Sequence, residues 1–255
     1  MGEQIAPDEF ADHCFGAVIL NDWSARDIQA WEYVPLGPNL GKSFATSISP
    51  WVVPIAALEA ARIDTPDQDP APLPYLLGEE KWGLDIDLAV EWNGHIVSRP
   101  PYAQMYWSPA QMLAHTAVNG AATRTGDLFG SGTISGTEKD QRGAFIELTW
   151  GGAEPVQVGD ETRTFLEDGD EISISASAPG PNARASVSVR CATASCPPRE
   201  TPSEQGLRHG GRRGRRYPLG CVARRRWFRP VGYPRRADRG DRRRRRLRLR
   251  GVLQQ

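Results

Sequence analysis

The chain has 255 residues, enough for one large domain or two ordinary ones, and its formal net charge of zero conceals two unlike segments. Residues 1–184 contain 10 Lys and Arg against 27 Asp and Glu, a net charge of −17. Residues 185–255 contain 21 arginines, no lysine and 4 acidic residues, a net charge of +17. No apolar run reaches the roughly 18 residues of a membrane span, and the acidic start MGEQIAPDEFADH lacks the pattern of a signal peptide.

A strand and a helix are the first predicted elements. Gly16–Leu20 (GAVIL) is an apolar run of strand length that leads into the polar pair Asn21–Asp22. Polar side chains at the end of a buried strand are well placed to face a cleft. Ser24, with Asp27 three residues later, predicts a capping box at the start of a short helix over residues 25–31.

Three polar residues of this helix are predicted to share one face. Arg26, Gln29 and Tyr33 follow one another at spacings of i, i+3 and i+7. Proline and glycine then break the chain into turns, after which Lys42–Ile48 and Trp51–Pro54 are predicted to be extended. A short helical piece is expected over residues 56–62.

The next signals are a hairpin, a second helix and a glycine-rich loop. Residues 84–92 alternate between apolar and mostly acidic side chains, and Asn93–Gly94 follows as a strong hairpin signal. Ser108–Pro109, with a glutamine at the third helical position, opens a helix that Asn119–Gly120 closes. Gly126–Gly136 is too rich in glycine for a strand core and suits close backbone approach to a ligand.

Two further alternating segments complete this part of the chain. Residues 144–150 predict a strand that places Glu147 on the face opposite Ile146 and Leu148, and residues 165–178 predict a turn and a strand. The resulting fold class is mainly β, mostly antiparallel, with a few short helices. No period of roughly 20–50 residues indicates repeats.

The residues alone leave the chemistry open. Asp22 and Lys42, with the polar residues between them, could form a functional cluster, or Asp22 could cap the helix while Lys42 is a solvated charge. Spacing favours the second interpretation, because a divalent cation needs several oxygen ligands and one carboxylate is too few. No nucleophile elbow, phosphate loop or dinucleotide motif is present, and three histidines are isolated in the sequence: His13, His95 and His115.

Several stretches, in the same order along the chain, resemble a known family, and this resemblance indicates a function that residue spacing alone does not. NDWSARDIQAWEYVPLGPNLGKSFATSISPWVVP (residues 21–54) resembles the signature region of the fumarylacetoacetase family. Further blocks agree in order and spacing: PYLLGE (74–79 region), YWSPAQMLAHTAVNG (106–120), GDLFGSGTISGTE (126–138), FIELTW (145–150) and FLEDGDEI (165–172). The resemblance covers roughly residues 10–184 and implies the mixed β-sandwich or roll of that family's C-terminal catalytic domain.

The resemblance also implies an activity: metal-dependent hydrolysis of a carbon–carbon bond in a β-diketone acid, giving fumarate and acetoacetate in the last step of tyrosine breakdown. It implies a Mg²⁺ or Ca²⁺ cofactor, a small-molecule substrate, a cytoplasmic location and a homodimer. By matching motif, the implied metal-site residues are Asp22, Lys42 and Thr46. The implied substrate contacts are Arg26, Gln29, Tyr33 and Thr133. Lys42 is also an implied catalytic donor, and Glu147 is the implied acid that orients a general-base histidine.

Two departures from the family limit these expectations. In the family, the base histidine and three more acidic ligands precede the NDWSARD block, whereas only 20 residues precede Asn21 here. We therefore expect a domain truncated at its N-terminus and inactive by itself. The alternatives are a non-catalytic remnant of the enzyme and a related acylpyruvate hydrolase.

The second departure begins after Arg184, where the resemblance stops. ASVSVRCATASCPP (185–198) can be back-translated into bases that, read from one base earlier, encode RIGLGEVRDRILPA, which resembles the family's C-terminus. We therefore expect domains at 1–184 and 185–255, the second an out-of-frame, arginine-rich and disordered tail. A nucleic-acid-binding arm is the less favoured reading of this tail. Its cysteines, Cys191, Cys196 and Cys221, lack the paired spacing of a zinc site, and Cys14 alone in the first segment suits a reducing compartment.

Overall fold

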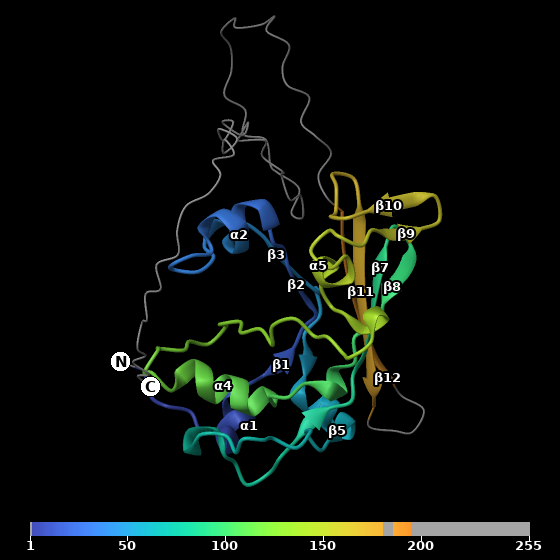
Figure 1. Ribbon diagram of the computed structural model, residues 1–255. Coiled ribbons are helices and arrows are strands. Elements are labelled where there is room, and N and C mark those ends of the chain that lie inside the picture. Colours follow the sequence, from blue (N-terminus) through green and yellow to red (C-terminus); the bar gives the residue numbers. More distant parts are fainter. Residues whose placement is uncertain (1, 181–185, 195–255) are drawn as a thin grey trace, which may run out of the picture. The chain divides into compact units, whose positions relative to one another are not determined.

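A computed structural model describes residues 2–180 and the backbone of residues 186–194 (Figure 1). All of these residues belong to one compact unit, Met1–Arg224, and the second unit, Arg225–Gln255, lies outside the described residues. The described part contains five small antiparallel sheets and short helices, so the expected mainly β class is confirmed.

One four-stranded sheet, in the order β12-β11-β7-β8, is the largest. Its strands are β7 (Asp87–Trp92), β8 (His95–Ser98), β11 (Glu171–Pro179) and β12 (Ser186–Ala194). The predicted hairpin joins β7 to β8, with positive φ angles of 48° at Asn93 and 81° at Gly94. Such angles match the twist of the flanking strands, which is why this turn could be predicted from two residues.

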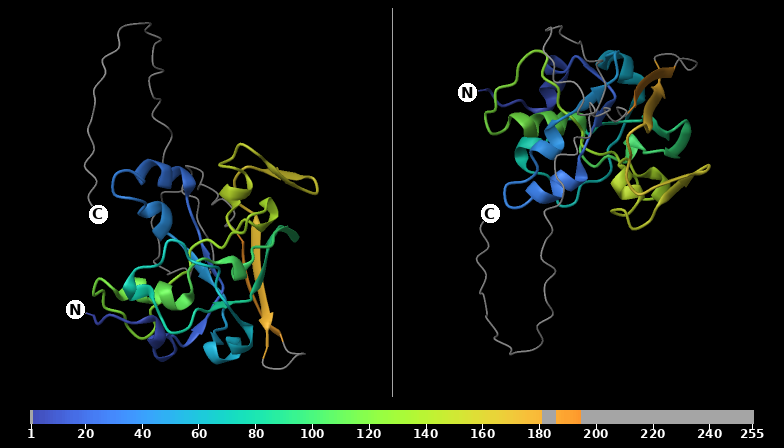
Figure 2. Two further views of the ribbon diagram at one scale, coloured as in Figure 1. Left: turned by 60° about the horizontal axis from the view of Figure 1, so that its bottom comes forward. Right: turned by 90° about the horizontal axis from the view of Figure 1, so that it is seen from above.

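Strand pairs form the other four sheets (Figures 1 and 2). They are β1 (Gly16–Ala17) with β4 (Val53–Pro54), β2 (Leu20–Asp22) with β3 (Thr46–Ile48), β5 (Arg62–Ile63) with β6 (Gly83–Leu84), and β9 (Val156–Val158) with β10 (Glu161–Arg163). The predicted strand over residues 16–20 is thus two shorter strands. Ile19 N–H donates to the Ser49 hydroxyl at 3.2 Å, and this side-chain bond interrupts the ladder.

The helices in the described part of the chain are all short, and they include five α-helices. These are α1 (Phe10–His13), α2 (Arg26–Glu32), α3 (Leu40–Ser43), α4 (Pro109–Ala117) and α5 (Phe145–Leu148), and the 3₁₀ helices are η1 (Pro7–Glu9), η2 (Ile55–Ala61), η3 (Pro74–Leu76), η4 (Tyr102–Gln104) and η5 (Lys139–Gln141). The capping box predicted for α4 is confirmed, because Gln111 N–H donates to Ser108 Oγ at 3.1 Å and Ser108 N–H donates to Gln111 Oε1 at 3.0 Å.

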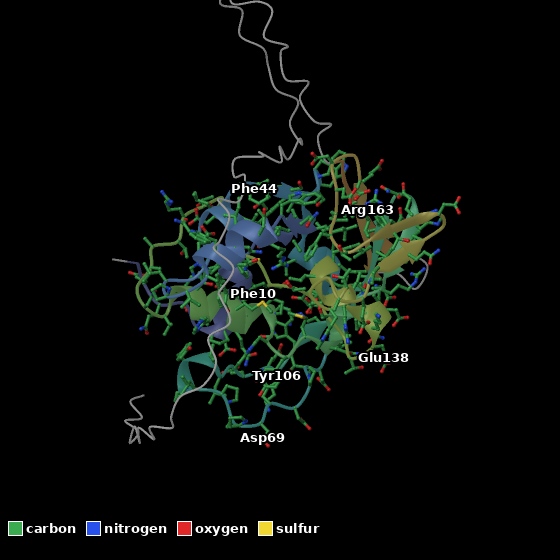
Figure 3. All side chains as sticks on the ribbon, turned by 45° about the horizontal axis from the view of Figure 1, so that its top comes forward. Phe10, Phe44, Asp69, Tyr106, Glu138 and Arg163 are labelled. Carbon is green, nitrogen blue, oxygen red and sulfur yellow. The ribbon has the colours of Figure 1, made fainter. Side chains whose placement is uncertain are left out.

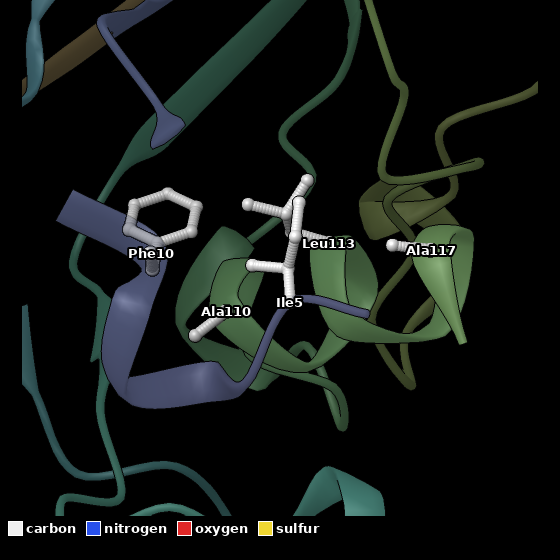
Figure 4. Packing of buried hydrophobic residues seen from close by; sticks show 5 residues of the cluster. All are labelled: Ile5, Phe10, Ala110, Leu113 and Ala117. Atoms are coloured by element: carbon white, nitrogen blue, oxygen red, sulfur yellow. The ribbon is translucent and has the colours of Figure 1, made fainter. Parts of the chain in front are cut away.

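The apolar core has two clusters. In the first, Ile5 and the α1 residue Phe10 pack on Ala110, Leu113 and Ala117 of α4 (Figure 4). The second joins η2 and β6 to the large sheet through Leu58, Ala61, Leu84 and Ala178, and burial raises the pKa of neighbouring Tyr102 to about 12.

A buried carboxylate ties the loops at one end of the large sheet. Asp170 is 3% exposed, and it accepts hydrogen bonds from Glu167 N–H at 2.7 Å and from Asn93 Nδ2 at 3.1 Å, with the Arg163 guanidinium at 3.3 Å. Burial by itself raises the pKa of Asp170, but these donors and the Arg163 charge outweigh it, so the net pKa is lowered.

Three predicted segments differ from the structure. Lys42 and Ser43, the first residues of the extended segment predicted over 42–48, form the end of α3, and residues 145–148 of the strand predicted over 144–150 form α5. Helix α5 begins where the Glu147 carboxylate accepts the Ala144 N–H at 3.1 Å, and it ends at Leu148, shortly before Trp150, where φ is 48°. The Ser24 cap was also wrong: Ala25 is the N-cap of α2, without a side-chain bond.

The expected disorder after residue 184 is wrong for nine residues. Ser186–Ala194 forms β12 and pairs with β11 in continuous register from Glu171↔Ala194 to Pro179↔Ser186. The remaining tail, residues 195–255, lies outside the described residues, so its predicted disorder stays a prediction.

Candidate functional site

The antiparallel pairing of β2 with β3 places two of the predicted site residues opposite each other. Asp22 and Thr46 are register partners at the end of this ladder, 24 residues apart in the chain. The next side chain, Trp23, donates its indole N–H to Ser47 Oγ at 2.9 Å and so fixes the direction of the chain as it leaves β2.

Lys42 closes this cluster from α3. Its Nζ lies 2.5 Å from Asp22 Oδ2 and donates to Ser24 Oγ at 2.8 Å. The two side chains of the ion pair are 30% and 44% exposed, Lys42 first, so water reaches both. The structure therefore brings Asp22, Lys42 and Thr46 together, which sequence spacing did not favour.

A carboxylate on α2 holds α3 in place. Glu32 accepts three backbone N–H bonds, from Asn39 at 2.6 Å, Leu40 at 3.0 Å and Gly41 at 2.7 Å. Partial desolvation would raise the pKa of Glu32, but these three donors outweigh it and the net pKa is lowered. Because these amides are the first N–H groups of α3, Glu32 caps the helix that carries Lys42.

Close backbone approach completes the α2–α3 clasp, which we define as residues 25–43. Gly41 O accepts the Ala25 N–H at 2.9 Å. A Cβ atom at Gly41 would lie 2.7 Å from Gln29 N and 3.1 Å from Ala25 O, so any side chain would push the helices apart. The glycine is therefore required for the close contact that positions Lys42.

The predicted shared face of α2 is confirmed for two of its three members. Arg26 Nη1 donates to Gln29 Oε1 at 2.8 Å, which leaves the Gln29 amide N–H groups to point elsewhere. Tyr33 is the C-cap residue of α2, and its carbonyl accepts the Gly37 N–H at 2.8 Å while the side chain is 58% exposed.

Glu147 belongs to a second group of residues, around α5. Its Oε2 accepts the Ser135 hydroxyl at 2.8 Å as well as the Ala144 N–H. Ser135 Oγ in turn accepts the Gly143 N–H at 3.0 Å. Glu147 and Ser135 line an open hollow of about 480 Å³ whose other walls are Gly136, Thr137, Arg142, Ile146, Trp150 and Gly151.

Thr133 lies on the same glycine-rich loop as Ser135 and is exposed. Within residues 2–180, no hydrogen bond or ion pair joins this loop or Glu147 to the Asp22–Lys42 group. Figure 3 shows the side chains of the described residues. The eight predicted site residues thus fall into two locally built groups, one on residues 22–46 and one on residues 133–147.

The described residues do not by themselves fit a divalent cation. The Asp22 carboxylate is engaged by the Lys42 ammonium, which has no lone pair to offer a metal. No three His, Cys, Asp or Glu side chains gather into a possible metal site in the part of the chain that the structure describes. Oxygen-ligated Mg²⁺ or Ca²⁺ therefore needs ligands beyond these residues.

Three residues that sequence reasoning missed support the site. Ser24 was assigned to a helix cap, whereas it accepts from Lys42. Glu32 and Ser135 were not singled out, although both bind backbone amides and so fix a predicted site residue. The signal for Ser135 lay in its glycine-rich surroundings, which were predicted to approach other groups closely. Separately, the helices of residues 2–180 are too short or too polar to cross a bilayer.

Comparisons with known proteins show similarity to fumarylacetoacetases. A fumarylacetoacetase from Arabidopsis thaliana is 50% identical over 181 residues, covering 69% of this chain and 43% of that protein. Fumarylacetoacetases from Caenorhabditis elegans and Homo sapiens are 50% and 48% identical, over 69% and 72% of this chain. The chain spans less than half the length of these relatives, 43% and 46% for the last two.

The family description "Fumarylacetoacetate (FAA) hydrolase C-terminal" matches residues 1–187. This match includes both the Asp22–Lys42 group and the Ser135–Glu147 group. The chain therefore belongs to the fumarylacetoacetate hydrolase C-terminal family.

Proposed function

We propose that this chain contributes one wall of a fumarylacetoacetase-type active site. The reaction is 4-fumarylacetoacetate plus water to fumarate plus acetoacetate. Water adds to a carbonyl carbon, the adjacent carbon–carbon bond breaks, and its electron pair leaves as an enolate that takes a proton. The substrate is anionic and develops further negative charge on oxygen, so the site needs fixed donors.

One observation carries the proposal: the match to fumarylacetoacetases includes a cluster in which Asp22, Lys42 and Thr46 meet from three elements. A salt bridge, a strand pairing and the Glu32-capped helix hold that cluster. Family membership alone would support only a hydrolase of this class. The clustering of the residues that the resemblance assigns supports the finer assignment.

Each residue has a role that its environment supports. Lys42 and the Gln29 amide donate to the developing oxyanion, and Gln29 is oriented by its bond from Arg26. Arg26, Tyr33 and Thr133 contact the substrate, with Thr133 near its distant carboxylate. Glu147 orients the general base, and the Ser135 and Ala144 donors fix its carboxylate.

The cofactor of the complete site is Mg²⁺ or Ca²⁺, with Asp22 as one of several oxygen ligands. The remaining ligands and the base come from residues outside the described ranges or from another polypeptide. We further propose a cytoplasmic location and a homodimeric complete enzyme, with no role for nucleic acid. A related acylpyruvate hydrolase activity is less favoured, since the matches above are to fumarylacetoacetases.

A non-catalytic remnant is the second candidate. It is favoured by one observation, the occupation of the Asp22 carboxylate by Lys42 where a cation ligand is required. The two candidates differ in whether Asp22 and Lys42 matter for turnover once the rest of the site is supplied.

Complementation tests the proposal. The full chain is mixed with Mg²⁺ and a polypeptide covering the part of a fumarylacetoacetase that this chain does not match, and fumarate and acetoacetate are measured. We expect turnover from the mixture, at least about 100-fold lower with Asp22→Asn or Lys42→Met. Lys139→Met is the matched control, since Lys139 pairs with Glu154. The non-catalytic remnant is supported by either of two results: turnover that is unchanged by Asp22→Asn and Lys42→Met, or no turnover in the mixture.

A further inference from the structure

The hollow beside α5 contains a positive charge that no acidic side chain neutralises within the described residues. Arg142 is the cation among its lining residues, and Glu147 is the acid. No ion pair joins Arg142 to an acid in residues 2–180. Glu147 accepts hydrogen bonds from other donors, and nearby Glu154 pairs with Lys139. The two acids closest to Arg142 are therefore bound elsewhere.

The Arg142 guanidinium is fixed at two points. Its Nη1 donates to the Glu147 carbonyl oxygen at 3.0 Å, and its Cζ lies 5.6 Å from the centre of the Trp150 ring. A guanidinium carries several N–H donors in one plane, and the described residues supply Arg142 with no other hydrogen-bond acceptor. Most of its donors are thus available to a ligand, in the planar arrangement that matches a carboxylate.

Backbone contacts hold the Arg142 segment against the glycine-rich loop. The Arg142 carbonyl accepts the buried Ser98 hydroxyl at 2.6 Å. The next residue is Gly143, where a Cβ atom would overlap Ile134 O and lie 3.2 Å from Thr133 Cγ2. Thr133, for which the family resemblance implies a contact with the substrate's distant carboxylate, therefore lies beside this segment.

Trp150 gives the hollow an apolar wall. Its φ angle of 48° is in the left-handed region, which is strained for a bulky residue, and its side chain is 66% exposed. Burial in the core therefore does not account for this conformation, whereas packing on a planar ligand does. The hollow's volume of about 480 Å³ lies within the range of small-molecule sites, roughly 300–1,000 Å³.

We propose that this hollow binds a small planar carboxylate, with the Arg142 guanidinium on the carboxylate group and Trp150 on the carbon skeleton. In the proposed reaction, Arg142 is then a specificity-determining residue for an acidic substrate, in addition to Thr133. That role rests on the proposed function, whereas carboxylate binding by the hollow does not.

Fumarate binding to the full chain tests the proposal without turnover. The readout is the indole N–H resonance of Trp150 in NMR spectra of the isotope-labelled chain, assigned by its loss in Trp150→Phe. We expect fumarate to shift this resonance saturably, with a half-saturating concentration at least about 10-fold higher in Arg142→Gln. The glutamine keeps a donor for the Glu147 carbonyl but loses the charge.

Two controls isolate the charge and its position. Arg124→Gln removes the same charge from an exposed pair with Asp127 and should leave fumarate binding unchanged. Fumaramide, the uncharged diamide of fumarate, should bind at least about 10-fold more weakly than fumarate to the unaltered chain. Circular dichroism checks folding. If Arg142→Gln unfolds, Arg142→Lys replaces it and should weaken fumarate binding, because an ammonium lacks the planar fork.

Any of four results overturns the proposal. They are no saturable shift of the Trp150 resonance, equal binding of fumarate and fumaramide, unchanged fumarate binding in the Arg142 variant, and an equal loss in Arg124→Gln. Failure of the proposed function is a separate result, scored as product formation in the complementation mixture. Binding without turnover would leave the carboxylate site in place, and turnover without fumarate binding would overturn this inference alone.

Discussion

The Glu147 carboxylate accepts a hydrogen bond from the Ser135 hydroxyl at 2.8 Å, across a separation of 12 residues. The same hydroxyl accepts the Gly143 N–H, so one serine joins the glycine-rich loop to the start of α5. This bond orients the Glu147 carboxylate, which the family resemblance assigns to the orientation of the general base.

Removing the Ser135 hydroxyl should loosen that junction. Ser135→Ala deletes a donor to Glu147 and an acceptor for Gly143, and we expect a loss of about 0.5–1.5 kcal/mol in the free energy of unfolding. Urea denaturation followed by tryptophan fluorescence measures it. Ser131→Ala is the control, because Ser131 bonds only to the adjacent Gly132 carbonyl. Equal stability of both variants would contradict a structural role for Ser135.

Replacing Glu32 should release the start of α3. In Glu32→Gln the amide offers one acceptor oxygen in place of the carboxylate that binds Asn39, Leu40 and Gly41. We expect faster hydrogen exchange at these three amides, measured by mass spectrometry or NMR. Glu79→Gln, an exposed loop change, should leave them unaffected.

The pH dependence of the same exchange has a defined direction. The folded pKa of Glu32 is lowered, so its contribution is complete above the unfolded glutamate pKa of about 4.3 and is lost as the pH falls through the folded value. The difference between the unaltered chain and Glu32→Gln should therefore vanish in acid. A difference that grows in acid would contradict the assignment.

The buried carboxylate of Asp170 should make a larger contribution to the free energy of unfolding than an exposed carboxylate. Asp170→Asn keeps the shape but removes the buried negative charge 3.3 Å from Arg163, and we expect a loss of about 1–3 kcal/mol near neutral pH. The folded pKa of Asp170 is lowered, so this stability is present above about pH 3.9 and is lost as the pH falls through the folded value. Urea midpoints across this range measure it, with exposed Asp168→Asn as the control.

A methyl group at Gly41 should separate α2 from α3. Gly41→Ala places a Cβ 2.7 Å from Gln29 N, and we expect a destabilisation of about 1–3 kcal/mol. The shift should also move Lys42 away from Asp22, visible as changed side-chain resonances of Lys42. Gly130→Ala is the matched control, since its nearest neighbour is 3.9 Å away. A fully stable Gly41→Ala variant would show that the clasp tolerates a wider spacing.

Elements with self-contained local signals were predictable from the sequence. Ser108 and Gln111 satisfy each other's backbone amides within one helical turn, and Asn93–Gly94 sets the turn between β7 and β8. Both signals need only neighbours in sequence. The α4 helix and the hairpin were therefore predicted correctly, with their bounds close to those observed.

Elements that depend on distant partners were not predictable in this way. Lys42 and Ser43 were predicted as the start of an extended segment, but they belong to α3, whose first amides are bound by Glu32 from the preceding helix. The residues of α5 alternate, yet Glu147 turns back to cap its own helix and meets Ser135. Side-chain to backbone hydrogen bonds of this kind can form a helix where the sequence alternates as in a strand. They produce no periodic pattern in the sequence from which the helix could be predicted.

For the candidate site, spacing and resemblance gave different results. Spacing favoured a solvated Lys42, because one carboxylate is too few to hold a divalent cation. The resemblance grouped the two, and the salt bridge confirms that they meet. The roles assigned to the eight residues stay predictions, as does the link between the two groups.

The pairing of β12 with β11 bears on how reading-frame changes are tolerated. Ladder bonds join backbone atoms, so they do not distinguish one side chain from another as long as the segment can extend. The sequence predicts a shift of frame near codon 184, which would replace every side chain of Ser186–Ala194. In that case the nine-residue ladder with β11 would form through backbone atoms that a change of side chains leaves in place.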